Sequence, residues 1–572
     1  MPVRNAETPE QFQEIGEAAK LVFAFRSLMR MNTTNTCHPS INGKKAVILH
    51  AAAENGNLPF LKVGGEADVV QGISLALAEV GHRVIVCAPS PLPAEELPEA
   101  KHIGTIRFSF GGRIESADAY LVRGTRGHPN LQEILLCHPA FVHPVPGKGY
   151  TVYTDDPADQ PFATDAAKFA EFSAAVAAGV ESGFFGHVDR IHVHDWHLGN
   201  LLVIRRYDPS CNRLRATPCV MTIHNAAIQG RRPFTGAASS FTAWYPQLLN
   251  GNRTALADPT LPHCYNPMAA GIRHADKIHL VSPGYVEEVL RPSDPSRGFY
   301  GGEGLEADLR EAQARDKLVG ILNGCDYAAA RTAPPASFAE LVSFLQALVV
   351  AWAGRHEVVP SRHFLAHARL AEVAASPQPP DVLLTSVGRL TDQKCLLMKQ
   401  PLRDGRPALW NILDALREAS GLLFLLGTGD AHYEAFFKQT TLAHQNFIFL
   451  NGFSSEAATA LYSCGSMFLM PSSFEPCGIA QMLAMARRQP CVVHGVGGLK
   501  DTVKDMETGF VFTGATPQDQ AENFVSTVNK ALQMQRADPV AWENIRKRAA
   551  AQRFLWAKAA DEYVNRLYQL PG

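Results

Sequence analysis

The sequence predicts an α/β protein made of two Rossmann-like, doubly wound domains in tandem. Three observations predict this class: short apolar runs of strand length recur along the chain, helical patterns separate them, and glycine-bearing loops follow several of the runs. A length of 572 residues supports two domains, because a single core stops growing at roughly 250 to 300 residues. No repeat of fixed period appears, which argues against solenoids and propellers.

The first unit of this pattern begins at residue 46. Residues 46–49 form an apolar run, a glycine-bearing loop follows, and apolar residues between 69 and 77 recur at helical spacing. Residues 83–88 form the next run, so that a helix joins two buried strands, as in a parallel βαβ unit. The further strand candidates are residues 190–193, 219–223, 277–281, 382–387, 422–426, 447–450, 467–470 and 490–493.

The pattern divides the chain into four segments. They are an N-terminal extension at 1–43 (a helix over 8–31 and a polar linker), a Rossmann-like domain at 44–325, a second Rossmann-like domain at 326–550, and a closing helix at 551–572. Residues 328–380 interrupt the strand rhythm with proline-rich flanks and one helical stretch. We therefore place an inter-domain hinge near the start of that segment.

Composition and charge exclude several classes of protein. A formal net charge of -2 gives no global field that would attract nucleic acid or an acidic membrane. The 46% hydrophobic and 19% charged residues are typical of a globular protein, and the most apolar stretches fall short of the roughly 18 residues that a membrane span requires. Scattered cysteines without a CxxC pair, and an N-terminus without a basic region and apolar run, predict a cytoplasmic protein with reduced thiols.

Two glycine-rich loops each precede a predicted helix. Lys62, Gly64 and Gly65 follow the first strand, and Gly497 and Gly498 follow a later one. Paired glycines at a helix N-terminus let a phosphate approach backbone N–H groups, and Lys62 adds a positive charge. Taken alone, either loop is more often a tight turn than a ligand site.

The segment from His192 to His197 closes a predicted strand and allows two interpretations. Alternation sends His192 and His194 to the same face, and three histidines with a carboxylate are compatible with a metal site. The order does not match the His-x-His-x-Asp-His run of binuclear hydrolases, so we favour the other interpretation. Asp195 then projects from the carboxyl end of a parallel strand into the crevice where open α/β sheets bind ligands, and His224 repeats this position at another strand end.

Two cations and a carboxylate follow strands in the second half of the chain. Arg389 and Lys394 lie near one loop after the run at 382–387, which suits a diphosphate leaving group, although such residues are also often merely solvated. Glu475 follows the run at 467–470, at a strand-to-helix junction where a carboxylate can bind a sugar.

Taken together and in this order, these motifs resemble those of the glycogen/starch synthases, the family 5 glycosyltransferases, whose fold is the two-domain GT-B arrangement. The likeness runs from about Lys45 to the C-terminus. The further motifs that carry it are Thr222-Ile223-His224-Asn225 with Gln229-Gly230, Ala275-Asp276 with Val281-Ser282-Pro283-Gly284-Tyr285, Gly320-Ile321-Leu322-Asn323-Gly324-Cys325-Asp326-Tyr327, Glu475-Pro476-Cys477-Gly478 and Gly497-Gly498-Leu499.

The resemblance implies a retaining glucosyltransferase that extends the non-reducing end of an α-1,4-glucan such as glycogen, without a cofactor or a metal. It implies ADP-glucose as the donor, with UDP-glucose as the alternative. Residues 44–325 would form the acceptor-side domain and residues 326–550 the donor domain, with the last helix packing back onto the first domain.

The resemblance also implies roles for single residues. Lys62, Gly64 and Gly65 would cradle the donor's phosphates, while Arg389 and Lys394 would clamp its diphosphate. The residues around the sugar and the base would be Asp195 and His224 beside the transferring glucose, Glu475 on its hydroxyls, Cys477 and Gly478 next to it, Asn323, Gly497 and Gly498 as further binding positions, and Phe453 as the aromatic platform for the base.

Two departures from the family pattern keep rival functions open. Cys395 stands where the family usually has glycine, and residues 328–380 lack the family's usual Trp-Asn-Pro segment. The rivals are a GT-B transferase with another acceptor, a catalytically silent glucan-binding homologue, and a metallohydrolase. Leu483 speaks against the first rival, because it occupies the second position of the Glu-x7-Glu pattern typical of such transferases.

Overall fold

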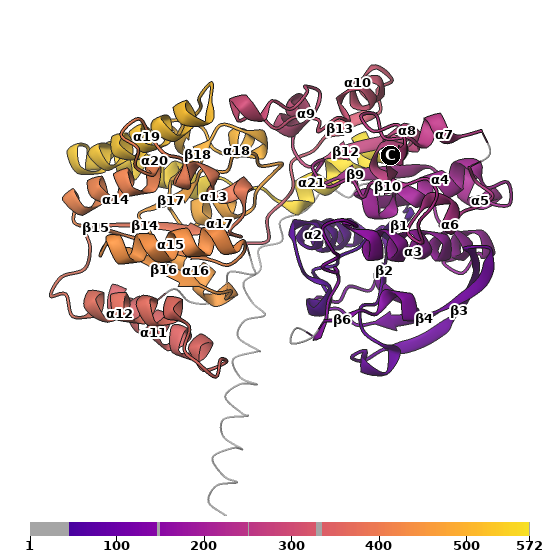
Figure 1. Cartoon of the computed structure of the whole chain (residues 1–572), viewed down its shortest axis with the longest axis horizontal. Helices are drawn as coiled ribbons and strands as arrows, with labels where there is room; N and C mark the ends of the chain where they lie inside the picture. The colour runs from indigo at the N-terminus through magenta and orange to yellow at the C-terminus, as the bar shows by residue number, and fades with distance from the viewer. Residues whose placement is uncertain (1–44, 146–148, 250, 328–334, 571–572) are drawn as a thin grey trace, which may run out of the picture. The chain divides into compact units, whose positions relative to one another are not determined.

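The computed structural model describes residues 45–145, 149–249, 251–327 and 335–570 (Figure 1). These ranges contain two large, mainly parallel sheets with helices on both faces, so the predicted α/β class with two doubly wound domains is confirmed. The helix predicted over 8–31, the linker up to residue 43 and the hinge at the start of 328–380 lie outside the described residues.

The first sheet runs in the order β13-β12-β9-β8-β1-β2-β5-β4-β3. Its strands are β1 (Val47–Ala51), β2 (Arg83–Pro89), β3 (Lys101–Phe110), β4 (Arg113–Val122), β5 (Leu131–Cys137), β8 (Arg190–His194), β9 (Cys219–Ile223), β12 (Lys277–Leu280) and β13 (Leu318–Gly320). The strands from β13 to β5 pair in parallel, whereas β3 and β4 form an antiparallel hairpin at the edge.

Helices cover both faces of this sheet with separate apolar cores. One face packs against α3 (Ala163–Ser182), α4 (Gly199–Tyr207) and α8 (Pro267–His274). The other packs against α2 (Gly65–Glu79), α21 (Trp556–Glu562) and the π-helical turn Tyr563–Leu567. The C-terminal segment therefore completes the core of the first sheet rather than that of the second.

Gly72 permits the close approach of α2 and α21. A Cβ at this position would lie 2.1 Å from the ring of Trp556. We expect Gly72→Ala to destabilise the protein by about 1–2 kcal/mol in urea unfolding, because overpacking outweighs the better helix propensity of alanine. In a Trp556→Ala background the same change should stabilise instead, and a loss of stability there would show that Trp556 is not the obstacle.

The second sheet runs in the order β16-β15-β14-β17-β18-β19, with every pair parallel. Its strands are β14 (Val382–Val387), β15 (Gly421–Gly427), β16 (Phe447–Asn451), β17 (Met467–Met470), β18 (Cys491–His494) and β19 (Gly509–Phe512). One face carries α13 (Asp392–Lys399), α14 (Ala408–Glu418), α15 (Ala431–Ala443), α19 (Pro517–Ala537) and α20 (Pro539–Ala551). The other carries α11 (Phe338–Ala353), α12 (Ser361–Ala374) and α16 (Ser455–Cys464).

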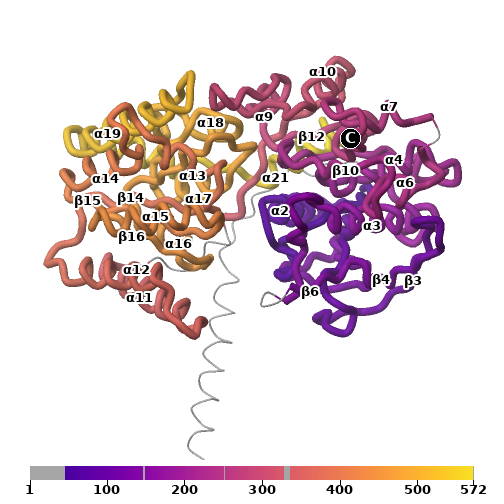
Figure 2. The backbone as a smooth tube through the Cα atoms, in the orientation of Figure 1, coloured from indigo at the N-terminus to yellow at the C-terminus, as the bar shows by residue number. Residues whose placement is uncertain are grey.

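The described part of the segment 328–380, residues 335–380, differs from the prediction, because it holds two helices where one was expected. Figures 1 and 2 show α11 and α12 side by side. The apolar pattern of α12 is weak: its buried residues are only His363, Ala366 and Leu370. A histidine at a core position hides the helical period from the sequence.

The remaining elements are short. They are β6 (Pro144–Val145), β7 (Gly149–Tyr150), β10 (Arg232–Pro233), β11 (Cys264–Tyr265), α5 (Asn212–Ala216), α6 (Phe241–Trp244), α7 (Arg253–Leu256), α9 (Pro283–Val289), α10 (Glu306–Ala314), α17 (Ala480–Ala486), α18 (Gly497–Thr502), and the 3-10 turns Pro59–Leu61, Ala94–Glu96, Pro139–Phe141, Trp196–Leu198 and Pro295–Arg297. Within the described ranges, no helix combines the length and the apolar character that a bilayer span requires.

Candidate active site

Each sheet has one point where the order of its strands reverses, and the candidate residues follow these points. In the second sheet the chain leaves β14 on one side for β15 and later returns on the other side as β17. Arg389 follows β14 and Glu475 follows β17. In the first sheet β1 and β8 are the corresponding pair, and Glu54 and Asp195 follow them. Ligands of open α/β sheets bind at the carboxyl ends of strands at such points.

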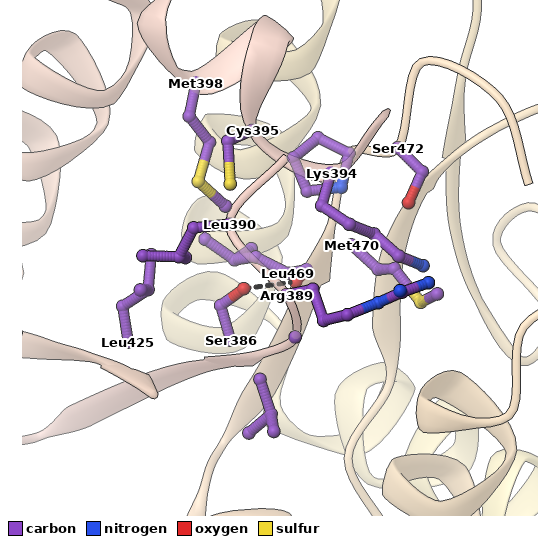
Figure 3. Close-up of a pocket in the computed structure, with 13 residues that line it drawn as sticks. Ser386, Arg389, Leu390, Lys394, Cys395, Met398, Leu425, Leu469, Met470 and Ser472 are labelled. Carbon is purple, nitrogen blue, oxygen red and sulfur yellow. Dashed lines mark hydrogen bonds between the residues drawn. The ribbon is translucent and has the colours of Figure 1, made fainter. Parts of the chain in front are cut away.

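Lys394 and Glu475 form an ion pair in the second sheet's site. Nζ of Lys394 contacts Oε2 of Glu475, and the hydroxyl of Ser472 donates to the same oxygen at 3.0 Å. Arg389 and Lys394 line one pocket, and Figure 3 shows their side chains extending in the same direction. The pocket thus offers two cations beside a buried carboxylate, which suits a ligand that carries both negative charge and hydroxyl groups.

Cys395 does not stand across this pocket. Its thiol is buried in the apolar core with Leu390 and Met398, at the pocket wall (Figure 3). Burial raises the pKa of the Cys395 thiol to about 12, so the group is a neutral thiol at pH 7.

The glycine pair at 497 and 498 packs directly against the Glu475 loop. The N–H of Gly498 donates to the carbonyl of Glu475 at 3.0 Å, and the N–H of Gly497 donates to Oε1 of Glu288 in α9 at 2.7 Å. A Cβ on Gly498 would lie 2.5 Å from Cys477 Cα. The two amides have protein partners in this structure, and the absence of side chains lets the two loops touch.

Replacing Gly497 tests this close approach. A Cβ there would lie 2.0 Å from the carbonyl oxygen of Glu475, and the residue has φ +41°. We expect Gly497→Ala to lower the free energy of unfolding by about 2–3 kcal/mol, because strain and backbone clash add. Gly127→Ala is the control: an added Cβ meets nothing within 4 Å there, so its unfolding free energy should stay within about 0.5 kcal/mol. Equal effects of the two changes would contradict the assigned role.

Asn323 and Cys477 meet next to this loop. Hydrogen bonds from Asn323 lower the pKa of the Cys477 thiol, but burial outweighs them and raises it to about 12. Oδ1 of Asn323 is buried without a hydrogen-bond partner among the described residues. Gly478 follows with φ +76°, a left-handed conformation that glycine adopts without strain.

Asp195 and His224 are brought together by neighbouring strands of the first sheet. The N–H of His224 donates to Oδ1 of Asp195 at 2.7 Å. Burial raises the pKa of Asp195 to about 7, against the backbone hydrogen bonds that favour the carboxylate. Asp195 also has φ +50°, which is strained for a residue with a side chain. Strain and a raised pKa at one residue indicate a functional position.

Two carboxylates near Asp195 were not predicted from the sequence. Oε2 of Glu54 accepts from the N–H groups of Val63 and Gly64, so a protein carboxylate occupies amides that the sequence assigned to a phosphate. Glu66 is buried, and burial followed by the charges of Glu54 and Asp195 raises its pKa well above the usual range. Glu54 could have been found from its place after the first parallel strand, and Glu66 from its place inside the glycine motif.

The other predicted positions lie at the surface or beside open space. Lys62 pairs with Asp68 at 2.7 Å, and its side chain is 48% exposed. An added Cβ on Gly65 would meet nothing within 4 Å. Phe453, two residues after β16, is 82% exposed, so its ring is free to receive a flat ligand. The sequence-based roles of these residues remain predictions.

Comparison with known proteins covers nearly the whole described chain. The family model of the starch synthase catalytic domain matches residues 47–311, and the model of the group 1 glycosyl transferases matches residues 384–533. The catalytic domain of starch synthase IV from Arabidopsis thaliana bound to ADP and acarbose has a TM-score of 0.68 at 23% identity, covering 92% of this chain and 99% of that one. Together with the paired sheets and their strand-end sites, these matches define a glycosyltransferase of GT-B fold.

Two relatives specify the family. The glycogen synthase of Exiguobacterium sibiricum is 30% identical over 525 residues, which cover 90% of this chain and 96% of that protein. The glycogen synthase of Moorella thermoacetica is 29% identical over 518 residues, or 88% of this chain and 93% of that protein. The chain belongs to the glycogen/starch synthase family of glycosyltransferases.

Proposed function

We propose that the chain is a retaining α-1,4-glucan synthase that transfers glucose from ADP-glucose to the non-reducing end of a glycogen-like acceptor. The ion pair of Lys394 with Glu475 beside Arg389 carries this proposal. Two neighbouring cations suit a departing diphosphate, and the adjacent carboxylate suits sugar hydroxyls, which supports the proposal. The Arabidopsis starch synthase bound to ADP supports adenine as the base.

The steps of the proposed transfer are assigned from the charges of the site residues and of the donor's diphosphate. The bond between the anomeric carbon and the diphosphate breaks, and Arg389 and Lys394 stabilise the negative charge that develops on the departing group. The acceptor's hydroxyl oxygen forms the new bond on the face that the diphosphate leaves, and its proton passes to a phosphate oxygen. Because that phosphate assists the hydroxyl, neither Asp195 nor Glu475 needs to act as a nucleophile, unlike the carboxylates of retaining glycosidases.

The first sheet's residues would hold the transferring glucose. Asp195 presents a carboxylate fixed by the His224 backbone, and His224 presents its ring at the adjacent strand end. Burial lowers the pKa of His224 to about 3, so the ring is neutral at pH 7 and acts by hydrogen bonding rather than by charge. The protein's cations supply the positive charge in this proposal, which requires no cofactor or metal.

The test is transfer to glycogen with ADP-glucose or UDP-glucose, in the presence of a chelator. We expect ADP release and glucose incorporation with ADP-glucose, an α-anomeric product by NMR, and loss of both signals in Glu475→Ala. Turnover only with UDP-glucose would overturn the donor, and a β-anomeric product would overturn retention. No turnover with either donor, from a protein with an intact circular dichroism spectrum, would favour a silent homologue or another acceptor.

A further inference from the structure

A continuous series of buried polar side chains links His224 to the C-terminal segment. Its members come from β1, β8, β9 and β12, from the residue after β9, and from the C-terminal segment that follows α21. We call it the histidine chain; in order its members are His224, His194, His50, Tyr568, His192, Thr222, His279 and Tyr563. All except His224 are buried among apolar residues of the first sheet.

The first half of the histidine chain leads from the substrate side to the C-terminal segment. Nε2 of His224 lies 3.0 Å from Nδ1 of His194, whose Nε2 lies 3.1 Å from Nδ1 of His50. The hydroxyl of Tyr568 lies 3.4 Å from Nε2 of His50 and 2.8 Å from Nδ1 of His192. One phenol therefore bridges two imidazoles from different strands.

The second half of the chain ends on a backbone carbonyl. Nε2 of His192 lies 2.6 Å from Oγ1 of Thr222, which lies 2.9 Å from Nδ1 of His279. The hydroxyl of Tyr563 lies 3.1 Å from that same Nδ1. Nε2 of His279 lies 3.2 Å from the carbonyl oxygen of Ile321.

These contacts explain the histidine cluster better than a metal does. The rings of His50, His192 and His194 offer nitrogens within 4.8 Å of one another, and all three are buried. Yet each of their ring nitrogens already faces a protein donor or acceptor, so no lone pair is left for an ion. Burial lowers the pKa of His50 to about 3 and that of His279 to about 4, so the rings are neutral and each carries one proton.

The carbonyl end fixes the direction of the hydrogen bonds. A carbonyl only accepts, so His279 carries its proton on Nε2 and leaves Nδ1 as an acceptor. The hydroxyls of Tyr563 and Thr222 both face that single lone pair. Thr222 has a second acceptor in Nε2 of His192, so we assign the lone pair of His279 to Tyr563 and the proton of Thr222 to His192; the contact between Thr222 and His279 then carries no proton.

The direction of the hydrogen bond from Thr222 to His192 sets the direction of each following hydrogen bond as far as His224. With Nε2 accepting, His192 donates from Nδ1 to Tyr568, and Tyr568 donates to Nε2 of His50. His50 then donates from Nδ1 to His194, which donates from Nδ1 to Nε2 of His224. Between Thr222 and His224, reversing any single hydrogen bond would place two protons or two lone pairs face to face in a buried contact, which is costly.

We propose that the histidine chain holds the proton of His224 on Nδ1, so that the C-terminal segment determines which hydrogen bond this ring offers to the substrate. Tyr568, His50, His192 and His194 are then positioning residues, since they act only through His224. The role of His224 toward the sugar rests on the proposed function, but the proton positions do not. His224 presents an N–H donor, and a sugar or phosphate oxygen is its complement.

Neutron diffraction from deuterium-exchanged crystals reads the proton positions without turnover. We expect deuterium on Nδ1 of His224, His194, His50 and His192, and on Nε2 of His279. Deuterium on Nε2 of all five rings would mean that Thr222 points the other way and would overturn the proposal. If the transfer assay fails but the deuterium pattern is as expected, the proposed glucosyl transfer is wrong and the proposed proton positions in the histidine chain still hold.

Variants then separate positioning from stability. Tyr568→Phe removes the bridging hydroxyl, so we expect the deuterium occupancy at Nδ1 of His224 to fall below one. We expect kcat to fall at least about fivefold with little change in KM, in proportion to the fraction of protein that carries the proton on Nδ1 of His224. Tyr245→Phe is the control, because it removes another buried hydroxyl, one that donates to the carbonyl of Ala170 outside the chain. Equal losses of kcat in the two variants would overturn the proposal.

A second pair of variants guards against a folding defect at Tyr568. Thr222→Val keeps the shape but removes the hydroxyl that donates to His192, whereas Thr222→Ser keeps the hydroxyl. We expect kcat to fall in the valine variant and to be restored in the serine variant. Unchanged deuterium occupancy at His224 in the valine variant would show that Thr222 does not set the direction.

Discussion

Replacing Lys394 with alanine is expected to lower kcat/KM for glucosyl transfer about 10³-fold, because the departing diphosphate loses one of the two cations that line its pocket. The loss should appear mainly in kcat, since the negative charge is larger in the transition state than in the bound donor. Initial rates with ADP-glucose and glycogen measure both parameters.

Lys399→Ala is the matched control for this prediction. Lys399 lies in the same helix, but its Nζ sits 5.4 Å from the ring centre of Tyr433, away from the pocket. Its removal should leave kcat/KM within about twofold. A comparable loss in both variants would show that α13 is sensitive to any truncation, and the electrostatic role of Lys394 would be withdrawn.

The same ion pair makes a prediction about stability. Lys394→Ala leaves Glu475 buried without its cation, which should cost about 1–3 kcal/mol in urea unfolding. Adding Glu475→Gln removes the uncompensated charge, so the double variant should regain most of that loss while remaining inactive. The second substitution would then restore stability without restoring activity.

The parallel strands could be predicted because both of their faces are buried. β9, β14 and β17 have the bounds that the apolar runs predict. The hairpin of β3 and β4 could not be predicted in the same way. Its residues alternate between exposed polar positions and buried ones such as Ile106 and Phe108, because the hairpin lies at the antiparallel edge of the sheet.

The candidate site divides along a similar line. Asp195, Arg389 and Glu475 could be predicted because each follows the end of a predicted strand, and the carboxyl ends of parallel strands lie at one edge of their sheet. The partners of the glycine amides could not be predicted. Glu54 faces Gly64 and Glu288 faces Gly497, the latter across 209 residues of sequence, and nothing local marks either pair.

The direction of the histidine chain is a further property that no local pattern reveals. His192 and His194 share a face by strand alternation, as predicted, and their rings stack 4.6 Å apart. Which nitrogen carries each proton depends on Ile321 and Tyr563, residues from a different strand connection and from the C-terminal segment. Side-chain chemistry here is set by tertiary contacts.

Asp195→Asn is expected to stabilise the protein at pH 8 while abolishing most of its activity. Burial raises the pKa of Asp195 to about 7, above its value in the unfolded chain. The native carboxyl therefore binds its proton more tightly than the unfolded one, and stability is lost as the pH rises from about 4 through about 7. Asparagine carries no charge, so the variant should gain on the order of 3 kcal/mol in unfolding free energy at pH 8 and little at pH 4.

Asp258→Asn provides the control of opposite sign. Burial pushes the pKa of Asp258 up, but hydrogen bonds from Thr260, Arg231 and Asn266 outweigh it and hold the pKa below its usual range. This carboxylate contributes stability above the unfolded pKa, so its replacement should destabilise the protein at pH 8. If both variants lose stability at pH 8, the carboxylate of Asp195 is not destabilised by burial, and its raised pKa is refuted.

The combination expected at Asp195 distinguishes a functional group from a structural one. If a carboxylate served only the packing of the fold, replacing it with a neutral residue would lower the stability of the protein. Asp195→Asn is instead expected to raise stability and to lower kcat/KM by about 10²-fold or more, because a fixed negative charge no longer faces the developing positive charge of the sugar. Its strained φ of +50° adds to the cost that the native fold bears at this position. Retained activity in a stabilised Asp195→Asn variant would move the charge-stabilising role to Glu54, the neighbouring carboxylate whose charge contributes to raising the pKa of Asp195.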